Sequence, residues 1–437
     1  MEKIISYIIK FLIGGENGGA IGSLVGYTDD MRKFPQYKVV IFPSLFFKEN
    51  FYGKPESIPR LPLNIIEGVP LLFGTPHIEW VGETLIVHAD IIASSYFLLT
   101  RYEEIQKRNE RDKYGRFPGK SSLPYQAGFI HRPIVDEYGK LLREWLRNTH
   151  VNLPEPQQKI NKIWLTHDVD APFYCRTLRS FIRVGIKGEG WKHALKYLTG
   201  PLAQDPYYTF PWLLEQDYSL KNTIGRERCE TILFFKSSGS SFADKPKYSL
   251  HSKDMRNLLT LCVSDKVSIG LHSSFDAGKT PSLISSELAL LEKATKQKIQ
   301  YNRHHYLASR EPEDMDWLER VGITDDFTMG YADIAGFRLG TCRPIHWINP
   351  VNKRISSLLL HPLTIMECSL NEPQYMNLDF NEALAYCQLL AEQVAQVNGE
   401  LVLLWHNDSV IKKRVPEALI NRQRELFTSF INKLKMA

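Results

Sequence analysis

Apolar segments of strand length alternate with amphipathic segments of helix length from residue 160 to the end of the chain. The strand candidates are Ile163–Leu165, Thr231–Phe235, Val267–Leu271, Ile299–Tyr301, Ile323–Phe327, Leu358–Ile365 and Leu401–Trp405. Helical periodicity fits residues 207–221, 252–264, 282–297, 312–321, 379–397 and 416–434. Such alternation predicts a parallel sheet covered by helices. We therefore predict an α/β fold in which residues 160–437 form a distorted (β/α)7-type barrel.

Residues 1–155 have a different pattern, which predicts a smaller N-terminal α+β domain. Short apolar segments there lie between Gly, Pro and Asn residues, as is typical of small strands and turns; examples are Lys38–Phe42, Leu71–Phe73 and Thr84–Val87. We expect helices from Ile91 to about Arg108 and from Pro133 to Arg147. The polar segment Pro154–Lys159 contains two prolines and predicts the linker between the two domains.

Ionisable side chains follow several of the predicted strands. The main candidates are Asp168, Asp170, His272, Asp276, Arg303 and His406, and further strand ends carry His304, His305, Asp325, Asp326 and His361. Taken singly, each has an ordinary structural explanation, such as a turn, a helix cap or a buried hydrogen-bonded histidine. The carboxyl ends of parallel barrel strands meet at one rim, however, and catalytic residues gather there. The repeated pattern therefore predicts a site at that rim.

Bulk composition excludes several classes of protein. The chain has 437 residues, 43% hydrophobic and 24% charged, as expected of globular enzymes. Its net charge of +5 includes no long basic run, so we predict no nucleic-acid partner. The six cysteines form no Cys-x-x-Cys pair, and the apolar run Ile4–Ile13 is short for a membrane span. These features predict a cytoplasmic protein without stable membrane insertion, and they fix no oligomeric state.

The strand-end motifs resemble those of the polysaccharide deacetylases of the NodB-homology class (carbohydrate esterase family 4). Thr166-His-Asp-Val-Asp170 is similar to the Asp-x-Asp form of their first motif, and His272-Ser-Ser-Phe-Asp276 is similar to their second, His-Ser/Thr-x-x-His. Arg303 matches the arginine that opens the third motif, and Trp405-His-Asn resembles the last. The resemblance implies a barrel of about seven strands and a metal-dependent hydrolase that acts on acetylated sugars.

The resemblance also implies a role for each matching residue. Asp168 would be the general base, Arg303 would hold it ionised, and His406 would protonate the leaving amine. A divalent metal would be bound by Asp170, His272 and Asp276.

One position departs from the family pattern. Asp276 stands where the second motif has a histidine, and this change weakens the preference for zinc, so manganese, cobalt or magnesium remain alternatives. If Asp276 does not bind the metal, His305 is the substitute to consider.

We expect an enzyme that removes acetyl groups, N-acetyl in particular, from a carbohydrate or glycan precursor. Two alternatives remain open. One is a non-catalytic barrel of this type that binds carbohydrate, since a fold does not license a function. The other is a metal-dependent hydrolase that acts on an acylated amine or an ester outside polysaccharide.

Overall fold

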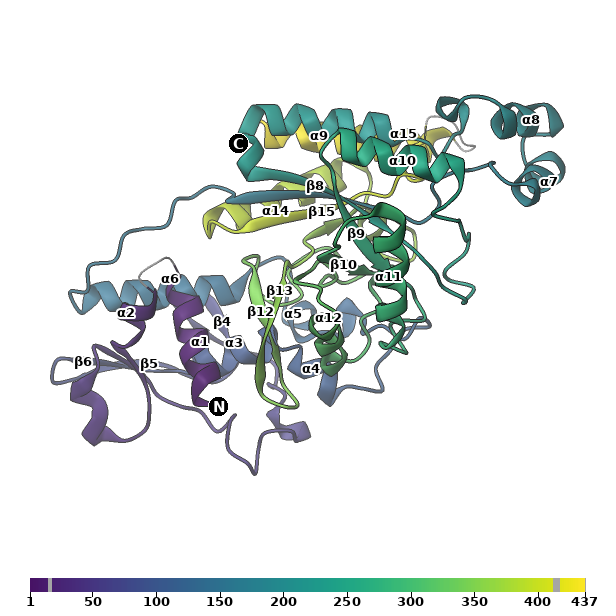
Figure 1. Cartoon of the computed structure of the whole chain (residues 1–437). Coiled ribbons are helices and arrows are strands. Elements are labelled where there is room, and N and C mark those ends of the chain that lie inside the picture. The colour runs from purple at the N-terminus through teal and green to yellow at the C-terminus, as the bar shows by residue number, and fades with distance from the viewer. Residues whose placement is uncertain (15–17, 412–416, 437) are drawn as a thin grey trace.

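The computed structural model describes residues 1–14, 18–411 and 417–436 (Figure 1). Its largest element is a curled sheet of nine strands. In spatial order these are β12 (Ile345–Asn349), β13 (Arg354–Leu360), β11 (Asp325–Asp326), β10 (Tyr301–His304), β9 (Ser268–Ser273), β8 (Cys229–Phe235), β7 (Lys162–Val169), β15 (Glu400–Leu404) and β14 (Ile365–Met366). All neighbouring pairs are parallel except β12 and β13, which form an antiparallel hairpin.

The curl of the sheet is evident from the segment that contains β13 and β14, because these two consecutive strands pair at opposite sides of the sheet. β13 pairs with β11, whereas β14, which begins five residues later, pairs with β15. Between them, the amide of His361 donates to the carbonyl of Asp326, and the amide of Thr364 donates to the carbonyl of Val402. A mixed α/β fold with a half-barrel sheet is therefore present.

Each predicted strand corresponds to a strand of this sheet, and the predicted strand Leu358–Ile365 is divided between β13 and β14. β12 was not predicted, because its five residues lie outside the strand–helix alternation.

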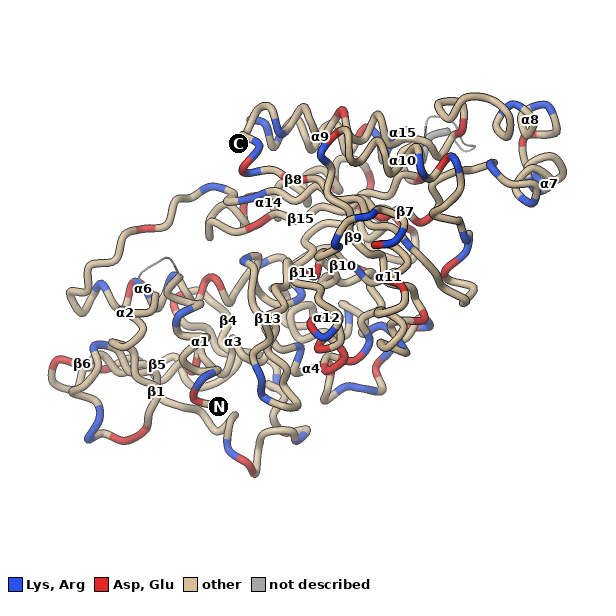
Figure 2. Tube along the Cα trace, in the orientation of Figure 1, with Lys and Arg blue, Asp and Glu red and all other residues tan. Residues whose placement is uncertain are grey.

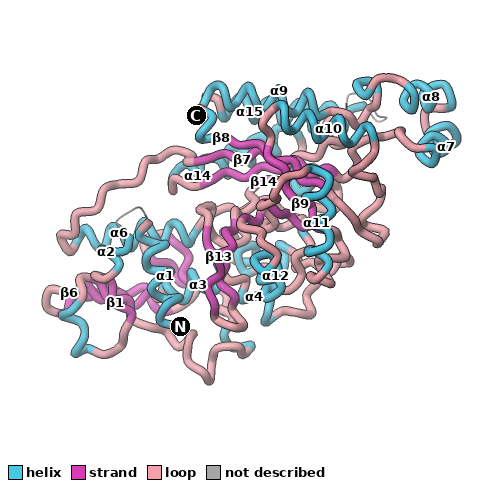
Figure 3. Tube along the Cα trace, viewed as in Figure 1, coloured by secondary structure: helices cyan, strands magenta, loops and turns pink. Residues whose placement is uncertain are grey.

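Helices cover the outside of the curled sheet (Figures 1 and 3). The helices of this part of the chain are α9 (Phe210–Ile224), α10 (Lys253–Ser264), α11 (Leu283–Thr295), α12 (Asp316–Arg320), α13 (Glu367–Asn371), α14 (Phe380–Gln396) and α15 (Glu417–Leu434). Two more, α7 (Leu178–Lys187) and α8 (Trp191–Thr199), project away from the sheet instead of covering it (Figure 1). Local chemistry fixes several starts: Ser252 caps α10 by accepting from the amide of Met255, and Asp379 with Glu382 forms a capping box on α14. The six predicted helices correspond to α9, α10, α11, α12, α14 and α15, although residue 416, the predicted start of the last, lies outside the described residues.

The N-terminal part has its own four-stranded sheet, in the order β1 (Val25–Tyr27), β2 (Val39–Ile41), β6 (Thr84–Ala89) and β5 (Gly74–Val81). A hairpin of β3 (Asn64–Ile66) and β4 (Val69–Leu71) lies beside it. Its helices are α1 (Glu2–Ile13), α2 (Gly18–Gly22), α3 (Ile91–Leu99), α4 (Tyr102–Gln106), α5 (Leu123–Gln126) and α6 (Ile134–Asn148). The single helix predicted from Ile91 is interrupted, because Arg101 adopts the left-handed region with φ of 56° between α3 and α4.

The N-terminal part packs directly against the curled sheet. One continuous core contains Ile8 and Trp145 of the first part together with Trp347 and Leu358 of the second. A buried ion pair joins the same two parts, because Glu104 of α4 accepts three hydrogen bonds from the guanidinium of Arg338. A division into domains at residues 155–160 therefore stays a prediction. No helix among the described residues is both long enough and apolar enough to span a bilayer.

Candidate metal centre and active site

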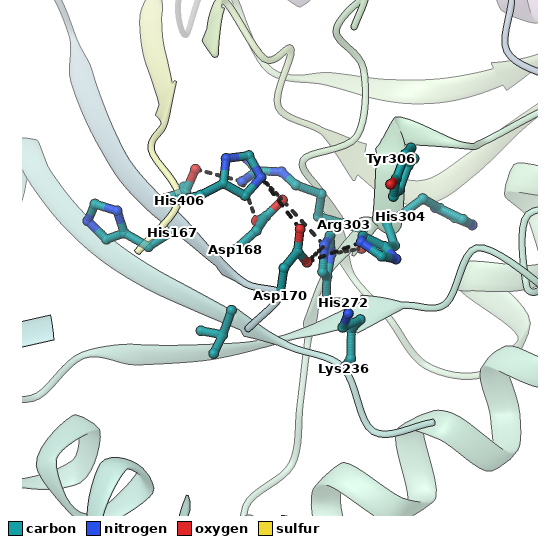
Figure 4. A network of polar contacts seen from close by, with 12 residues as sticks. His167, Asp168, Asp170, Lys236, His272, Arg303, His304, Tyr306 and His406 are labelled. Carbon is teal, nitrogen blue, oxygen red and sulfur yellow. Dashed lines mark hydrogen bonds and ion pairs between the residues drawn. The ribbon is translucent and has the colours of Figure 1, made fainter. Parts of the chain in front are cut away.

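Six side chains converge where the central strands of the curled sheet end (Figure 4). β7 carries Asp168 and leads directly into Asp170, β9 carries His272, β10 carries Arg303 with His305 just beyond, and β15 leads into His406. The strands run parallel and Arg303 is the register partner of His272, so their carboxyl ends lie at the same level. Side chains from distant parts of the sequence therefore meet at one rim, as the strand-end pattern predicted.

Three of these residues form a group of possible metal ligands. Oδ1 of Asp170 lies 3.2 Å from Nε2 of His272 and 3.2 Å from Nε2 of His305. The three ligand atoms all lie within 4.8 Å of one another. Oδ1 of Asp170 and Nε2 of His272 are buried, and neither has a hydrogen-bond partner among the described residues. Buried polar atoms are normally satisfied, so this convergence suits a cation that accepts lone pairs from all three.

The other nitrogen of each imidazole fixes its tautomer. Nδ1 of His272 lies 2.9 Å from the carbonyl oxygen of Arg303, and a carbonyl only accepts, so Nδ1 carries the proton. Nδ1 of His305 lies 2.9 Å from Oδ1 of Asp244. Burial raises the pKa of Asp244. Hydrogen bonds with His305, the amide of Phe275 and Ser241 lower the pKa by more than burial raises it, so this carboxylate is ionised. Both Nε2 atoms are left free to donate lone pairs, as metal-bound histidines require.

Asp276, which was predicted as a metal ligand, lies outside this group. Its Oδ2 accepts from the backbone amides of Ser240, at 2.9 Å, and Ser241, at 3.0 Å. The chain turns immediately after β9, with the amide of Ala277 donating to the carbonyl of Ser274, and this turn carries Asp276 away from His272. The structure thus places Asp276 apart from Asp170 and His272, and His305, the substitute considered above, lies beside them instead.

Asp168 is held beside the same group by Arg303. Nη1 of Arg303 donates to Oδ1 of Asp168 at 3.0 Å and to Oγ1 of Thr166 at 2.7 Å, and the guanidinium is fully buried. Burial raises the pKa of Asp168, but the neighbouring His272 and the charge of Arg303 outweigh that effect, so the pKa lies below its usual value. Asp168 is therefore an ionised carboxylate with a fixed orientation, as a general base requires.

His406 faces the two carboxylates from the side away from His272 (Figure 4). Its Nε2 lies 4.0 Å from Oδ2 of Asp168 and 3.9 Å from Oδ2 of Asp170. Its Nδ1 lies 2.7 Å from Oε1 of Glu367, which also accepts from the amide of His406 at 2.8 Å. Burial lowers the pKa of His406, but Glu367 more than offsets this, and the pKa lies well above its usual value. His406 is thus arranged as a proton donor.

Glu367 is the member of the site that the sequence analysis missed. It is fully buried at the first position of α13, directly after β14. The available signal was its place after the predicted strand Leu358–Ile365, the same kind of position that singled out the other candidates.

Other strand-end residues that drew attention in the sequence lie outside this site. His361 bonds Oε2 of Glu400 at 2.7 Å and Oδ1 of Asp325 at 3.0 Å, in a separate buried network. Asp326 accepts from the side-chain amide of Asn302 at 2.8 Å. Burial above all, and after it the neighbouring His272, lowers the pKa of His304 to about 3, so this imidazole is neutral. These residues are explained by packing and hydrogen bonding.

A loop of the N-terminal part reaches the edge of the site. The rings of Tyr114 and Tyr306 lie 5.0 Å apart, and Arg116 donates to the carbonyl of Tyr306 at 3.1 Å. Tyr306 follows His305 directly and adopts φ of 61°, a region that non-glycine residues rarely enter. Such strained backbone gathers at functional sites and persists only where the surroundings impose it. Contacts from Tyr114 and Arg116 supply that constraint here.

Comparison with known proteins gives little beyond this geometry. A family of unknown function (DUF7033) matches residues 20–151. No curated protein matches the sequence. One similar solved structure is a chain from Mycobacterium smegmatis whose title gives polysaccharide deacetylase as a provisional description. It is 14% identical, the alignment covers 65% of this chain and 86% of that chain, and the TM-score is 0.39. The matched family lies within the N-terminal part, so the chemistry of the site rests on its own geometry.

Proposed function

We propose that this chain is a metal-dependent hydrolase that removes acetyl groups, N-acetyl groups in particular, from a carbohydrate. One observation carries the proposal: a carboxylate oxygen and two imidazole nitrogens converge beside a second carboxylate fixed by a buried arginine. Structural ion-pair networks rarely leave two of the converging atoms without hydrogen bonds. Catalytic metal sites, in contrast, combine three protein ligands with an open position for water or substrate.

Asp170, His272 and His305 would hold the metal ion. One carboxylate and two histidines make a donor set found in catalytic zinc sites, so zinc is the first choice, with manganese, cobalt or magnesium as alternatives. A bound ion supplies Lewis-acid polarisation of the acetyl carbonyl and a lowered pKa of water. A donor set with His305 has two imidazole nitrogens, whereas the set predicted with Asp276 has one. The set with His305 therefore favours zinc more strongly.

The remaining residues divide the proton transfers between them. Asp168, kept ionised by Arg303, accepts the proton of the attacking water. His406, kept protonated by Glu367, donates a proton to the nitrogen of the leaving amine, which otherwise departs poorly. Each positioned proton transfer of this kind contributes roughly 10²- to 10⁴-fold to the rate.

The arrangement of the strands supports a more specific description of the fold. We propose that the curled sheet is a seven-stranded (β/α) barrel, with β13 and β14 as two halves of one strand and β12 as an external hairpin. In such barrels catalytic side chains lie at the carboxyl ends of the strands, which is where all six converging residues lie.

Acetate release from N-acetylated and O-acetylated oligosaccharides, measured on zinc-loaded protein, tests this function. We expect release from at least one N-acetylated substrate, a loss of 10²-fold or more in Asp168→Asn, and little change in Asp276→Asn. Bound metal without acetate release from any carbohydrate would reject the substrate class. Neither bound metal nor acetate release, with retained glycan binding, would leave the non-catalytic barrel as the better explanation.

A further inference from the structure

A helical hairpin stands away from the rest of the molecule beside the site. It consists of α7 and α8, which follow β7, and Figure 1 shows it projecting beyond the helices that cover the sheet. The hairpin has a small core of its own, formed by Cys175, Val184, Ala194 and Tyr197. Its internal packing therefore uses one side of each helix and leaves the other side to the surroundings.

The outer surface of this hairpin is unusually apolar. Leu178, Ile182 and Ile186 recur every four residues along α7, so they share one face of the helix. Trp191 and Leu195 have the same spacing on α8. All five side chains are between 45% and 71% exposed. Large apolar side chains gathered on one exposed element mark an interaction surface.

The same two helices carry most of the excess positive charge of the chain. Between residues 178 and 200 there are five basic residues and one acidic residue, Glu189, which gives +4 of the +5 of the whole chain. The basic residues are Arg179, Arg183, Lys187, Lys192 and Lys196. Figure 2 shows positive residues on both helices. The exposed apolar residues of both helices therefore have Lys and Arg residues as neighbours in the sequence.

We propose that the α7–α8 hairpin docks on the surface of a bilayer that contains anionic phospholipid. Helices with a polar face rich in Lys and Arg and an apolar face with Trp, Leu and Ile lie in the plane of the interface, with the apolar face among the acyl chains. Anionic headgroups attract the flanking cations, each by enough to raise the affinity several-fold. A second copy of the chain fits this surface poorly, because two hairpins of +4 would repel each other.

The base of the hairpin connects this surface with the site. Asp205 accepts from the amides of Tyr174 and Cys175, which holds the two ends of the hairpin together. The side chain of Asn407, the residue after His406, donates to the carbonyls of Ala171 and Tyr207. A docked hairpin would therefore hold the mouth of the site near the bilayer surface. Docking itself needs no catalysis, so its test is independent of the proposed activity.

Co-sedimentation of the full chain with phospholipid vesicles tests the proposal. We expect binding to vesicles of phosphatidylcholine mixed with phosphatidylserine, weak binding to phosphatidylcholine alone, and weakening by added salt. Ile186→Glu should reduce the partition coefficient about tenfold or more. The double variant Lys187→Gln with Lys192→Gln should weaken binding to anionic vesicles and leave binding to neutral vesicles unchanged. Leu45→Glu, at an equally exposed leucine of the N-terminal part, is the matched control and should bind as the wild type does.

Three results would overturn the proposal. One is equal binding to neutral and anionic vesicles. Another is binding of Ile186→Glu equal to that of the wild type, with circular dichroism showing that the two have the same helical content. The third is absence of vesicle binding together with self-association in sedimentation velocity that Ile186→Glu abolishes, which would assign the surface to contacts between copies of the chain.

Discussion

Replacement of Asp244 by Asn tests whether His305 or Asp276 is the third metal ligand beside Asp170 and His272. Oδ1 of Asp244 accepts from Nδ1 of His305 at 2.9 Å and from the amide of Phe275 at 2.8 Å, and Oδ2 accepts from Oγ of Ser241 at 2.8 Å. Asparagine has the same shape and keeps a carbonyl oxygen for the first two donors. Its amide nitrogen can donate to the serine hydroxyl. The substitution therefore removes the negative charge behind His305 and little else.

The expected effect is a weaker metal site with an intact fold. A carboxylate behind a ligating imidazole raises its basicity and fixes its tautomer, and loss of such a partner typically costs 10- to 100-fold in metal affinity. This corresponds to about 1.4 to 2.7 kcal/mol of binding free energy. The value should lie near the upper end, because both side chains are buried and the bond is short.

Competition for zinc between the purified protein and a chromophoric chelator measures this affinity directly. Asp276→Asn is the matched control, since it neutralises a nearby carboxylate that bonds only Ser240 and Ser241 among the described residues. The control should bind zinc as the wild type does. An affinity of Asp244→Asn equal to that of the wild type, with a tenfold loss in Asp276→Asn, would refute the assignment of His305 and restore Asp276 as a ligand.

Three further predictions concern the proton donor, metal loading and the junction between the two parts. Glu367→Gln removes the carboxylate that raises the pKa of His406. The alkaline limb of the pH–rate profile, which reports loss of the His406 proton, should therefore shift to lower pH, and an unchanged limb would contradict this. Zinc at 100 times its dissociation constant should stabilise the fold by about 2.7 kcal/mol and raise the melting temperature by about 3 °C for a chain of 437 residues, and a chelator should reverse the shift in a thermal scan. Arg338→Met removes a buried partner of Glu104 and should lower the free energy of unfolding, measured in urea, by about 3 kcal/mol. Arg354→Ala removes one partner of an exposed ion pair and should lower it by about 1 kcal/mol or less. Equal losses in the two variants would argue against burial as the cause.

The sequence by itself determined most of the elements of the curled sheet and the edge at which the ionisable side chains gather. Strand–helix alternation located every parallel strand of the sheet, although not the antiparallel β12, because period and length are local properties of the chain. The abrupt change from apolar residues to Asp168 and Asp170 after a strand marked the rim, since buried charge without a partner is costly. Five of the six predicted site residues, all except Asp276, lie together in the structure for this reason.

Only the tertiary structure decided which side chains share the site. The spacing of His272 and Asp276 suits one face of a helix, but a turn after β9 directs Asp276 to the amides of Ser240 and Ser241 instead. His305 follows β10 and Glu367 follows β14, so their distances from Asp170 and His406 depend on strand register and on the curl of the sheet. Pattern within a segment fixes what the segment forms, whereas convergence between segments depends on packing that no single segment encodes.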